Sequence, residues 1–264
     1  MSEPNPPVQL KRDGAIAEIL LNRPEVMNAA NRDLAESFLD ACKAIAADEG
    51  VRVVLLRGAG KAFMGGGDLA GFHADPEHAE DAANALIRPL NAAVLILAEL
   101  PVPVVASLHG AVAGAGVSLA LACDLAIAAD NVKFNLAYSR VGASPDVSGS
   151  WSLPRVVGLR KAMEIALLAE NIDAAEALRL GLVNRVVAAA DLAAETEALV
   201  RRLAAGPSFS YGTIKKLLRS SHEHDLRTQM EAERLAFCGC TRTRDFGEGV
   251  AAFYEKRPAH FTGS

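Results

Sequence analysis

The chain has few aromatic residues, few cysteines and little net charge. Aromatics make up 5% of its 264 residues, cysteine occurs four times, and the formal net charge is −5. This mildly acidic balance excludes the general electrostatic attraction by which basic proteins bind nucleic acid. Cys238 and Cys240 form the one close cysteine pair, and no second ligand pair lies at metal-binding spacing. We therefore expect no metal site and a reduced, cytoplasmic location.

Long uninterrupted apolar runs are also missing. Residues 111–129 form the richest stretch, but glycines, Ser118 and Asp124 interrupt it, so we expect a buried core element and no membrane partner. Residues 1–7 are polar and proline-rich, and they lack the basic and apolar segments of a secretory signal. Hydrophobic residues nevertheless make up 51% of the chain, which is enough for a sizeable core.

Hydrophobic periodicity predicts an α/β core followed by helices. Strand patterns and helical patterns alternate in the first part, which favours parallel strands. The strands are expected at 15–21, 51–57, 102–108, 124–129 and 132–135, the last two joined by a tight turn, and the helices at 31–47 and 81–100. From residue 158 onward we expect helices at 160–168, 174–180, 191–204, 208–220, 223–237 and 244–256. Gly206-Pro207 suggests a boundary between a core, 1–205, and a helical C-terminal region, 206–264.

Two glycine clusters follow predicted strands, one within 58–69 and one within 110–116. Neither matches the phosphate-binding P-loop or the dinucleotide fingerprint. Glycine allows the backbone to approach a ligand closely, and the N-terminus of the apolar helix expected near Ala115 offers free N–H groups. One N–H donor from each loop could hold a carbonyl oxygen that gains negative charge. Either cluster alone would indicate only a tight turn.

These motifs, taken in order, resemble the crotonase family, the enoyl-CoA hydratase/isomerase superfamily. The resemblance covers nearly the whole chain and rests on LNRPEVMNA at 21–29, AFMGGGDL at 62–69, GAGVSLALACD at 114–124, LPR at 153–155, AAEALRLGLV at 174–183 and FYEKR at 253–257. It implies an α/β crotonase fold, a spiral of ββα units with a helical C-terminal trimerisation region, and a homotrimer or a dimer of trimers. It also implies an acyl-CoA thioester as substrate, with coenzyme A as part of that substrate and no further cofactor.

The resemblance further implies where the site lies. The oxyanion hole of the family corresponds to the backbone N–H groups of Gly67 and Ala115, and a backbone donor tolerates the alanine that replaces a glycine here. The same resemblance assigns contacts with the CoA or acyl group to Arg23, Glu25, Val26, Ala62, Phe63, Gly65, Gly66, Asp68, Leu69, Gly114, Ser118 and Tyr138. Phe253 and Lys256 would contact the nucleotide from the end of a chain, either the same chain or a neighbouring one.

The two glutamates that hydratases of this family use are absent. Ser118 and Tyr138 stand at their positions, and neither ionises as a carboxylate does. Asp146 lies eight residues beyond Tyr138, in a segment similar to two crotonase subgroups that carry an aspartate there. These subgroups are isomerases, including the ring-epoxide isomerase of phenylacetyl-CoA degradation, and 4-chlorobenzoyl-CoA dehalogenases. The dehalogenases also use a histidine on the long helix, and residues 81–100 contain none.

We therefore expect an isomerase that shifts a double bond through an enolate, with Asp146 as the acid and base. Burial would raise the pKa of Asp146, whereas its structural alternative is a turn or a helix cap. Two alternatives remain: hydration by a non-standard acid/base set, and an acyl-CoA-binding homologue without catalysis. Glu80 is a more distant candidate base, and Asp68 and Asp124 are interpreted as structural residues.

Overall fold

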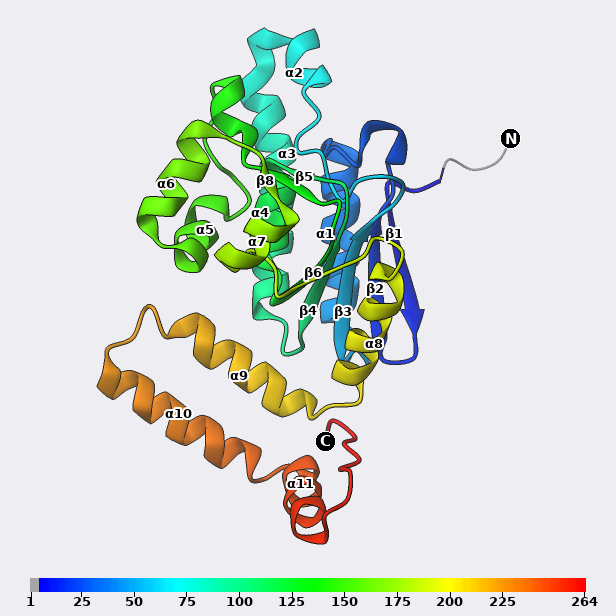
Figure 1. Cartoon of the computed structure of the whole chain (residues 1–264), viewed down its shortest axis with the longest axis vertical. Helices are drawn as coiled ribbons and strands as arrows, with labels where there is room; N and C mark the ends of the chain where they lie inside the picture. Colours follow the sequence, from blue (N-terminus) through cyan, green and yellow to red (C-terminus); the bar gives the residue numbers. More distant parts are fainter. Residues whose placement is uncertain (1–4) are drawn as a thin grey trace.

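The computed structural model describes residues 5–264. Its main sheet has six strands in the spatial order β1-β2-β3-β4-β6-β9 (Figure 1). These are β1 (Val8–Asp13), β2 (Ile16–Leu21), β3 (Val53–Gly58), β4 (Val104–Leu108), β6 (Leu125–Ala129) and β9 (Arg185–Val187). Only the β1–β2 pair of this sheet is antiparallel, and each other neighbouring pair is parallel. A second sheet joins β5 (Ala111–Ala113), β7 (Lys133–Asn135) and β8 (Ile172–Asp173).

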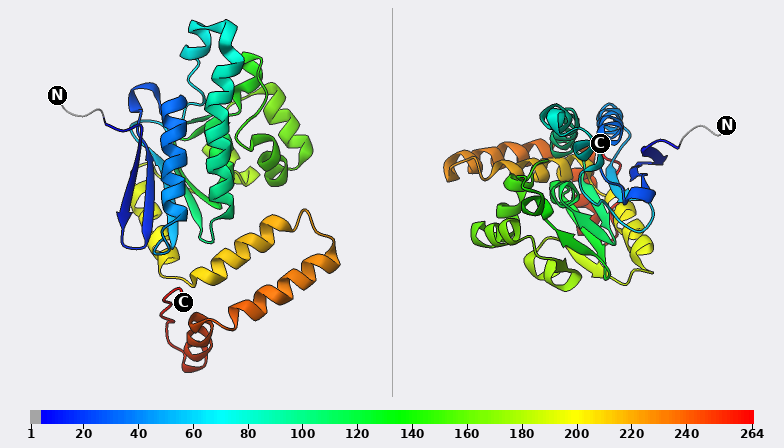
Figure 2. Two further views of the ribbon diagram at one scale, coloured as in Figure 1. Left: turned by 180° about the vertical axis from the view of Figure 1, so that it is seen from behind. Right: turned by 90° about the horizontal axis from the view of Figure 1, so that it is seen from above.

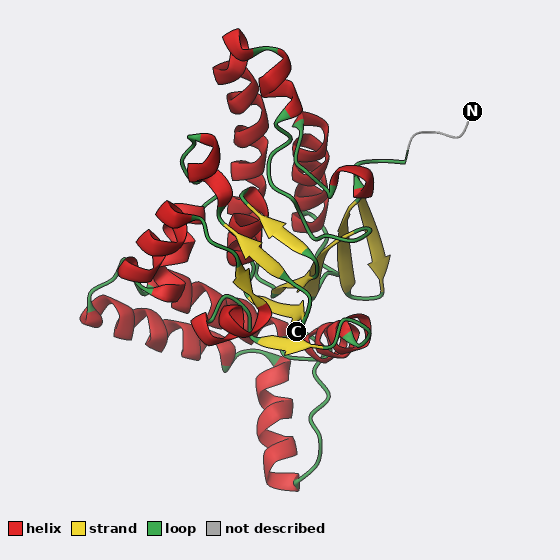
Figure 3. Cartoon of the chain, turned by 45° about the horizontal axis from the view of Figure 1, so that its top comes forward, coloured by secondary structure: helices red, strands yellow, loops and turns green. Residues whose placement is uncertain are grey.

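Helices cover both faces of the main sheet, and Figure 3 shows the central strands between them, with the β1–β2 hairpin at the outer edge. Helices α1 (Arg32–Ala46) and α3 (Ala79–Glu99) lie side by side on one face (Figure 2). Helix α8 (Leu192–Ala204) packs on the other. Along β3, Val54 and Leu56 belong to the main core, whereas Val53 and Leu55 pack towards α8. Burial on both faces explains why these parallel strands are continuous apolar runs.

The richest apolar stretch forms a buried helix with the strands on either side of it. Helix α4 (Ala115–Ala122) is surrounded by protein, so its apolarity reflects burial on all sides, as the sequence predicted. Helices α5 (Gly149–Val157), α6 (Leu159–Leu168) and α7 (Ala174–Leu180) follow it. The short elements are η1 (Pro24–Val26), α2 (Ala70–Ala74), η2 (Pro76–His78) and η3 (Ala137–Val141).

Three helices form an arm that extends from the core (Figures 1 and 2). They are α9 (Ser208–Ser220), α10 (Leu226–Cys240) and α11 (Arg244–Glu255). No residue of α10 is buried. The arm exposes large apolar side chains of Phe209, Ile214, Leu218, Leu226, Met230, Leu235, Phe237, Val250, Phe253 and Tyr254.

Helix α3 contradicts the expectation that no segment is apolar enough for a membrane span. Residues Pro76–Glu99 contain an 18-residue window of mean hydropathy 1.3, which meets the length and composition of a span. The helix packs along α1, and its buried side chains are Leu86, Leu90, Ala93, Val94 and Leu97. A core helix passes the same test, so this one helix gives only weak support for a membrane span.

Candidate active site

The two glycine clusters contact each other directly. Met64 donates its N–H to the carbonyl of Ala111 at 3.2 Å and accepts from the N–H of Ala113 at 2.8 Å. A Cβ added to Gly116 would lie 2.6 Å from the Met64 carbonyl oxygen, so only glycine fits at this approach. The structure therefore brings together two loops that lie about fifty residues apart in the sequence.

The backbone directs the N–H groups of Gly67 and Ala115 away from their own loops. Ala30 donates to the carbonyl of Gly66 at 2.7 Å and accepts from Asp68 at 2.8 Å. In such a parallel bridge the N–H of the residue between them, Gly67, points to the opposite side. Ala115 is the first residue of α4, where N–H groups have no partner within the helix.

Gly114 turns the chain into α4. Its φ of +49° and ψ of −120° are strained for any residue with a Cβ. Its N–H donates to the carbonyl of Asn135 at 2.9 Å, which ties the second loop to β7. The adjacent N–H of Ala115 is thus held by a fixed turn, and the two loops can present a pair of preorganised donors.

Asn28 and Arg23 fasten the first loop, and the role of Asn28 was not predicted. The fully buried Asn28 side chain donates to the carbonyls of residues 59, 62 and 63 at 2.8–3.1 Å, and its Oδ1 accepts from the N–H of Arg23. Arg23 forms an ion pair with Asp68 at 3.1 Å. The residue type was the one sequence signal for this role: Asn28 has a φ of +57°, which asparagine tolerates better than most residues.

Ala62 and Phe63, to which the resemblance assigns contact with CoA, are buried. Their exposed fractions are 1% and 0%, so such a contact would involve their backbone and not their side chains. Glu25, Val26 and Leu69 are exposed beside the first loop, where a ligand can reach them. Gly65 and Gly66 directly precede Gly67 in the first loop.

Ser118, Tyr138 and Asp146 form a hydrogen-bonded row. Ser118 lies on α4, three residues beyond Ala115, and its Oγ is 3.3 Å from the hydroxyl oxygen of Tyr138. The Tyr138 hydroxyl donates to Oδ1 of Asp146. The row therefore links the candidate base, Asp146, to the helix that carries one of the two candidate oxyanion donors.

Asp146 lies in a strained and half-buried turn. Burial raises the pKa of its carboxyl group, and the hydrogen bond from Tyr138 opposes that rise. The next two residues, Val147 and Ser148, have φ values of +50° and +70°. A left-handed β-branched residue is rare and costs on the order of 1–3 kcal/mol, and such strain clusters at functional sites. Ser148, and not Asp146, occupies the N-cap position of α5, and no side chain caps that helix, which argues against the helix-cap interpretation.

The remaining candidates lie apart from this row. Glu80 is exposed in the first turn of α3. Phe253, 78% exposed, lies on α11, and Lys256 caps that helix, at the far end of the molecule from α2 (Figure 1). Within one chain they are not brought to the glycine loops. Among residues 5–264, no three His, Cys, Asp or Glu side chains gather as a metal site.

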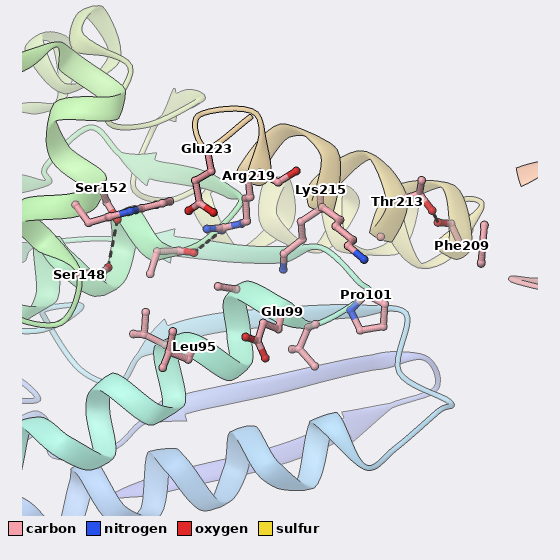
Figure 4. A pocket seen from close by; sticks show the side chains of 18 residues that line it. Leu95, Glu99, Pro101, Ser148, Ser152, Phe209, Thr213, Lys215, Arg219 and Glu223 are labelled. Carbon is pink, nitrogen blue, oxygen red and sulfur yellow. Dashed lines mark hydrogen bonds between the residues drawn. The ribbon is translucent and has the colours of Figure 1, made fainter. Parts of the chain in front are cut away.

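A cavity of about 800 Å³ opens elsewhere, between the end of α3, α5 and α9 (Figure 4). None of the predicted site residues lines it, although Ser148, two residues beyond Asp146, does. Apolar side chains such as Leu95 and Trp151 alternate there with the charged groups of Lys215 and Arg219. This cavity therefore borders the segment that follows Asp146 and does not lie at the glycine loops.

Comparison with known proteins places these features in a family. The sequence model described as enoyl-CoA hydratase/isomerase matches residues 11–264. The chain is 39% identical over 249 residues to the 1,2-epoxyphenylacetyl-CoA isomerase of Escherichia coli K12, covering 94% of this chain and 95% of that protein. It is 40% identical over 248 residues to a Rhodobacter capsulatus protein named "Probable enoyl-CoA hydratase", with the same coverage. The solved enoyl-CoA hydratase of Polaromonas sp. JS666 has a TM-score of 0.91 and 34% identity, covering 97% of this chain and 99% of that one.

The mixed sheets, the touching loops and the C-terminal helices are those of the α/β crotonase fold, whose family members bind acyl-CoA substrates. The chain belongs to the enoyl-CoA hydratase/isomerase family. The predicted family and fold are thereby confirmed. An isomerase and a hydratase are about equally similar to it, so the comparisons define an acyl-CoA enzyme family and leave the reaction open.

Proposed function

We propose that this chain is an enoyl-CoA isomerase-type enzyme that shifts a double bond in an acyl-CoA thioester. The observation that carries the proposal is the half-buried carboxylate of Asp146, with Ser118 and Tyr138 where hydratases have glutamates. Water addition is helped by two carboxylates, whereas a proton shift needs one group that takes a proton and returns it. A single raised-pKa carboxylate suits the second reaction.

The proposed reaction moves one proton and one double bond. Asp146 removes a proton from the carbon next to the thioester carbonyl of a 3-enoyl-CoA, and the electron pair spreads into a dienolate. The N–H groups of Gly67 and Ala115 stabilise the negative charge on the thioester oxygen. Protonated Asp146 then gives its proton to the carbon at the far end of the dienolate. The product is the 2-enoyl-CoA, with no water added and no electron gained or lost.

Two other functions remain as alternatives. Relatives named as hydratases, including a crotonyl-CoA hydratase of Syntrophomonas wolfei at 34% identity, favour hydration by a non-standard acid/base set. Loss of both expected glutamates favours a homologue that binds acyl-CoA without catalysis. The strained turn that holds Asp146 argues against the silent homologue, since strain is seldom retained without a use.

Incubation of trans-3-hexenoyl-CoA with the enzyme in deuterated water separates these functions by mass spectrometry. The proposal predicts trans-2-hexenoyl-CoA with no added water, and deuterium at the fourth carbon to the extent that Asp146 exchanges with solvent. A product heavier by one water would replace the proposal with hydration. Binding of the thioester in calorimetry without any product, here and with ring-derived thioesters, would support the silent homologue.

We also propose that the protein is a homotrimer or a dimer of trimers, supported by the apolar arm. None of the 15 residues of α10 is buried, and monomeric proteins rarely expose apolar surface on this scale. In such an assembly Phe253 and Lys256 of one copy could reach the nucleotide bound by another. Light scattering after size exclusion should give three or six times 27.7 kDa. A mass of one chain at micromolar concentration would contradict the proposal.

A further inference from the structure

We propose that Tyr138 is a positioning residue that holds one carboxylate oxygen of Asp146, and that Ser118 in turn fixes the hydroxyl of Tyr138. The inference rests on the proposed function of Asp146 as the base. It changes the expected role of Tyr138 and Ser118 from substrate contact to control of the base. Three observations carry it: the direction of the hydrogen bonds, the confinement of Ser118, and the free oxygen left on Asp146.

The hydrogen bonds have one consistent direction. A phenol has a single proton, and Tyr138 donates it to Oδ1 of Asp146. The Ser118 hydroxyl, 3.3 Å away, must therefore donate to the oxygen of Tyr138. Donation into the phenol oxygen makes the phenol a stronger donor, because hydrogen bonds in a chain polarise one another. The row thus runs from Ser118 through Tyr138 to the carboxylate.

Ser118 has no room to move away from Tyr138. Its side chain is fully buried on α4. Gly149, the first residue of α5, faces it so closely that a Cβ there would collide with the Ser118 hydroxyl oxygen. The α4–α5 contact therefore fixes the hydroxyl, and through it the phenol of Tyr138.

Asp146 keeps one oxygen for chemistry. Oδ1 accepts from Tyr138, and no other side chain within residues 5–264 donates to the carboxylate, so Oδ2 is left for a substrate. A carboxylate that is held at one oxygen presents the other in a fixed direction. Positioning of this kind is worth large factors in rate, since a displacement of about 1 Å can cost ~100-fold.

Tyr138 also affects the pKa of Asp146. Burial raises the pKa of Asp146, and the hydrogen bond from Tyr138 lowers it. Burial and the nearby carboxylate raise the pKa of Tyr138, so the phenol stays protonated as a donor. The charged groups on the neighbouring η3, α5 and α6 have other partners or are exposed. Arg140 donates to the Ala169 carbonyl, and Arg155 lies over the ring of Trp151. Lys161 pairs with Glu164, and Arg160 is exposed.

The test compares the pH dependence of the wild type with that of Tyr138→Phe. The variant keeps the ring and loses the donor, so the carboxylate of Asp146 is less stabilised and should titrate at higher pH. We expect the acid limb of kcat/KM to move to higher pH, and kcat at the upper plateau to fall by about 10- to 100-fold. Ser118→Ala should move the limb in the same direction by less. Tyr211→Phe on α9 is the matched control and should move nothing.

A second readout does not depend on turnover. Carbon-13 NMR of labelled aspartate carboxyls, with the Asp146 signal identified by its loss in Asp146→Asn, should show a higher titration midpoint in Tyr138→Phe. An unchanged midpoint, or a rate loss without any shift of the pH profile, would overturn the inference. A fully active Asp146→Asn would instead overturn the proposed function of the base, and the two failures are therefore distinguishable.

Fluorine labelling keeps the inference testable if Tyr138→Phe does not fold. The chain has three tyrosines, so 3-fluorotyrosine can be introduced at all of them, and Tyr211→Phe and Tyr254→Phe assign the remaining signal to Tyr138. The Tyr138 signal should change with pH together with the carboxyl of Asp146. A Tyr138 signal that is independent of pH across that titration would overturn the inference.

Discussion

Asp146→Asn should lower kcat for double-bond isomerisation by about 10²- to 10⁴-fold, the usual contribution of a general acid or base. Asparagine has the same shape and its Oδ1 can still accept from Tyr138, but its amide cannot take up a proton at ordinary pH. Affinity for a non-reacting thioester such as hexanoyl-CoA should change little, because the oxyanion donors and the loops are untouched. The measurement is initial rate with trans-3-hexenoyl-CoA beside calorimetric binding of hexanoyl-CoA.

Glu80→Gln provides the matched control, because Glu80 is the other acid considered as a base and is exposed on α3. It should retain the wild-type rate. A reversal, with an inactive Glu80→Gln and an active Asp146→Asn, would move the base to α3. If both variants were inactive in binding as well as in rate, the effect would be on folding, which circular dichroism detects.

The pH profile gives a second view of the same residue. The base must be deprotonated to act, so kcat/KM should rise with pH through the pKa of Asp146 in the free enzyme. Because burial raises that pKa, the acid limb should lie above the range of an ordinary aspartate. The limb should disappear in the residual activity of Asp146→Asn.

Local sequence signals were sufficient for most helices and central strands. Helices 174–180 and 208–220 begin and end where predicted, and Asn31, which accepts from the N–H of Leu34, marks the start of α1 as a cap. Strands 53–58 and 104–108 lie within two residues of their predicted starts. These elements have strong periodicity or clear caps, and packing does not override them.

Long-range pairing could not be predicted in the same way. The tight turn expected between 124–129 and 132–135 is present, with Val132 donating to the carbonyl of Ala129 at 3.1 Å. The sheet membership was not predictable: β6 and β7 belong to different sheets, because each pairs with strands distant in sequence. Strand β1 is largely exposed and polar, so it lacks the apolar signal of the central strands. Helix α5 was missed because Gly149 and Pro154, both poor helix formers, lie inside it.

Part of the candidate site was likewise predictable from the sequence and part was not. The two glycine loops were predictable because a close approach of two backbones requires glycine, and the structure brings the loops together. The hydrogen bond from Tyr138 to Asp146 was not, because it depends on how η3 and the strained turn fold over α4. Asp146 was found by resemblance, whereas the role proposed for its neighbour required coordinates.

An ion cluster around the buried Lys215 joins the C-terminal arm to the core. Asp124 pairs with Lys215 at 2.8 Å and with Arg219 at 2.7 Å, and it also accepts from the N–H of Val104. The Lys215 ammonium donates to the carbonyls of Leu97 and Val102 as well. Asp124 was expected to be structural, and these contacts show what it holds: α9 against the ends of α3 and β4.

Asp124→Ala should therefore lower the free energy of unfolding by about 3–5 kcal/mol, the cost of leaving a buried charge without its partner. Lys215 is 8% exposed, and burial already lowers the pKa of its ammonium group, which Asp124 opposes. Denaturation by urea, at equal protomer concentration because association adds to stability, measures the change. A loss below about 1 kcal/mol, the scale of an exposed pair, would contradict the prediction.

Two further variants show whether the buried charge is the cause. Glu231→Ala removes an exposed ion pair with Arg234 on α10, and it should destabilise the protein far less than Asp124→Ala, because solvent screens an exposed pair. Asp124→Ala combined with Lys215→Met removes both charges, and replacement of a buried pair by apolar groups is often neutral. The double variant should therefore recover part of the stability that Asp124→Ala loses. If it is less stable than Asp124→Ala alone, the contacts of Lys215 with the two carbonyls, and not its pairing with Asp124, hold the arm in place.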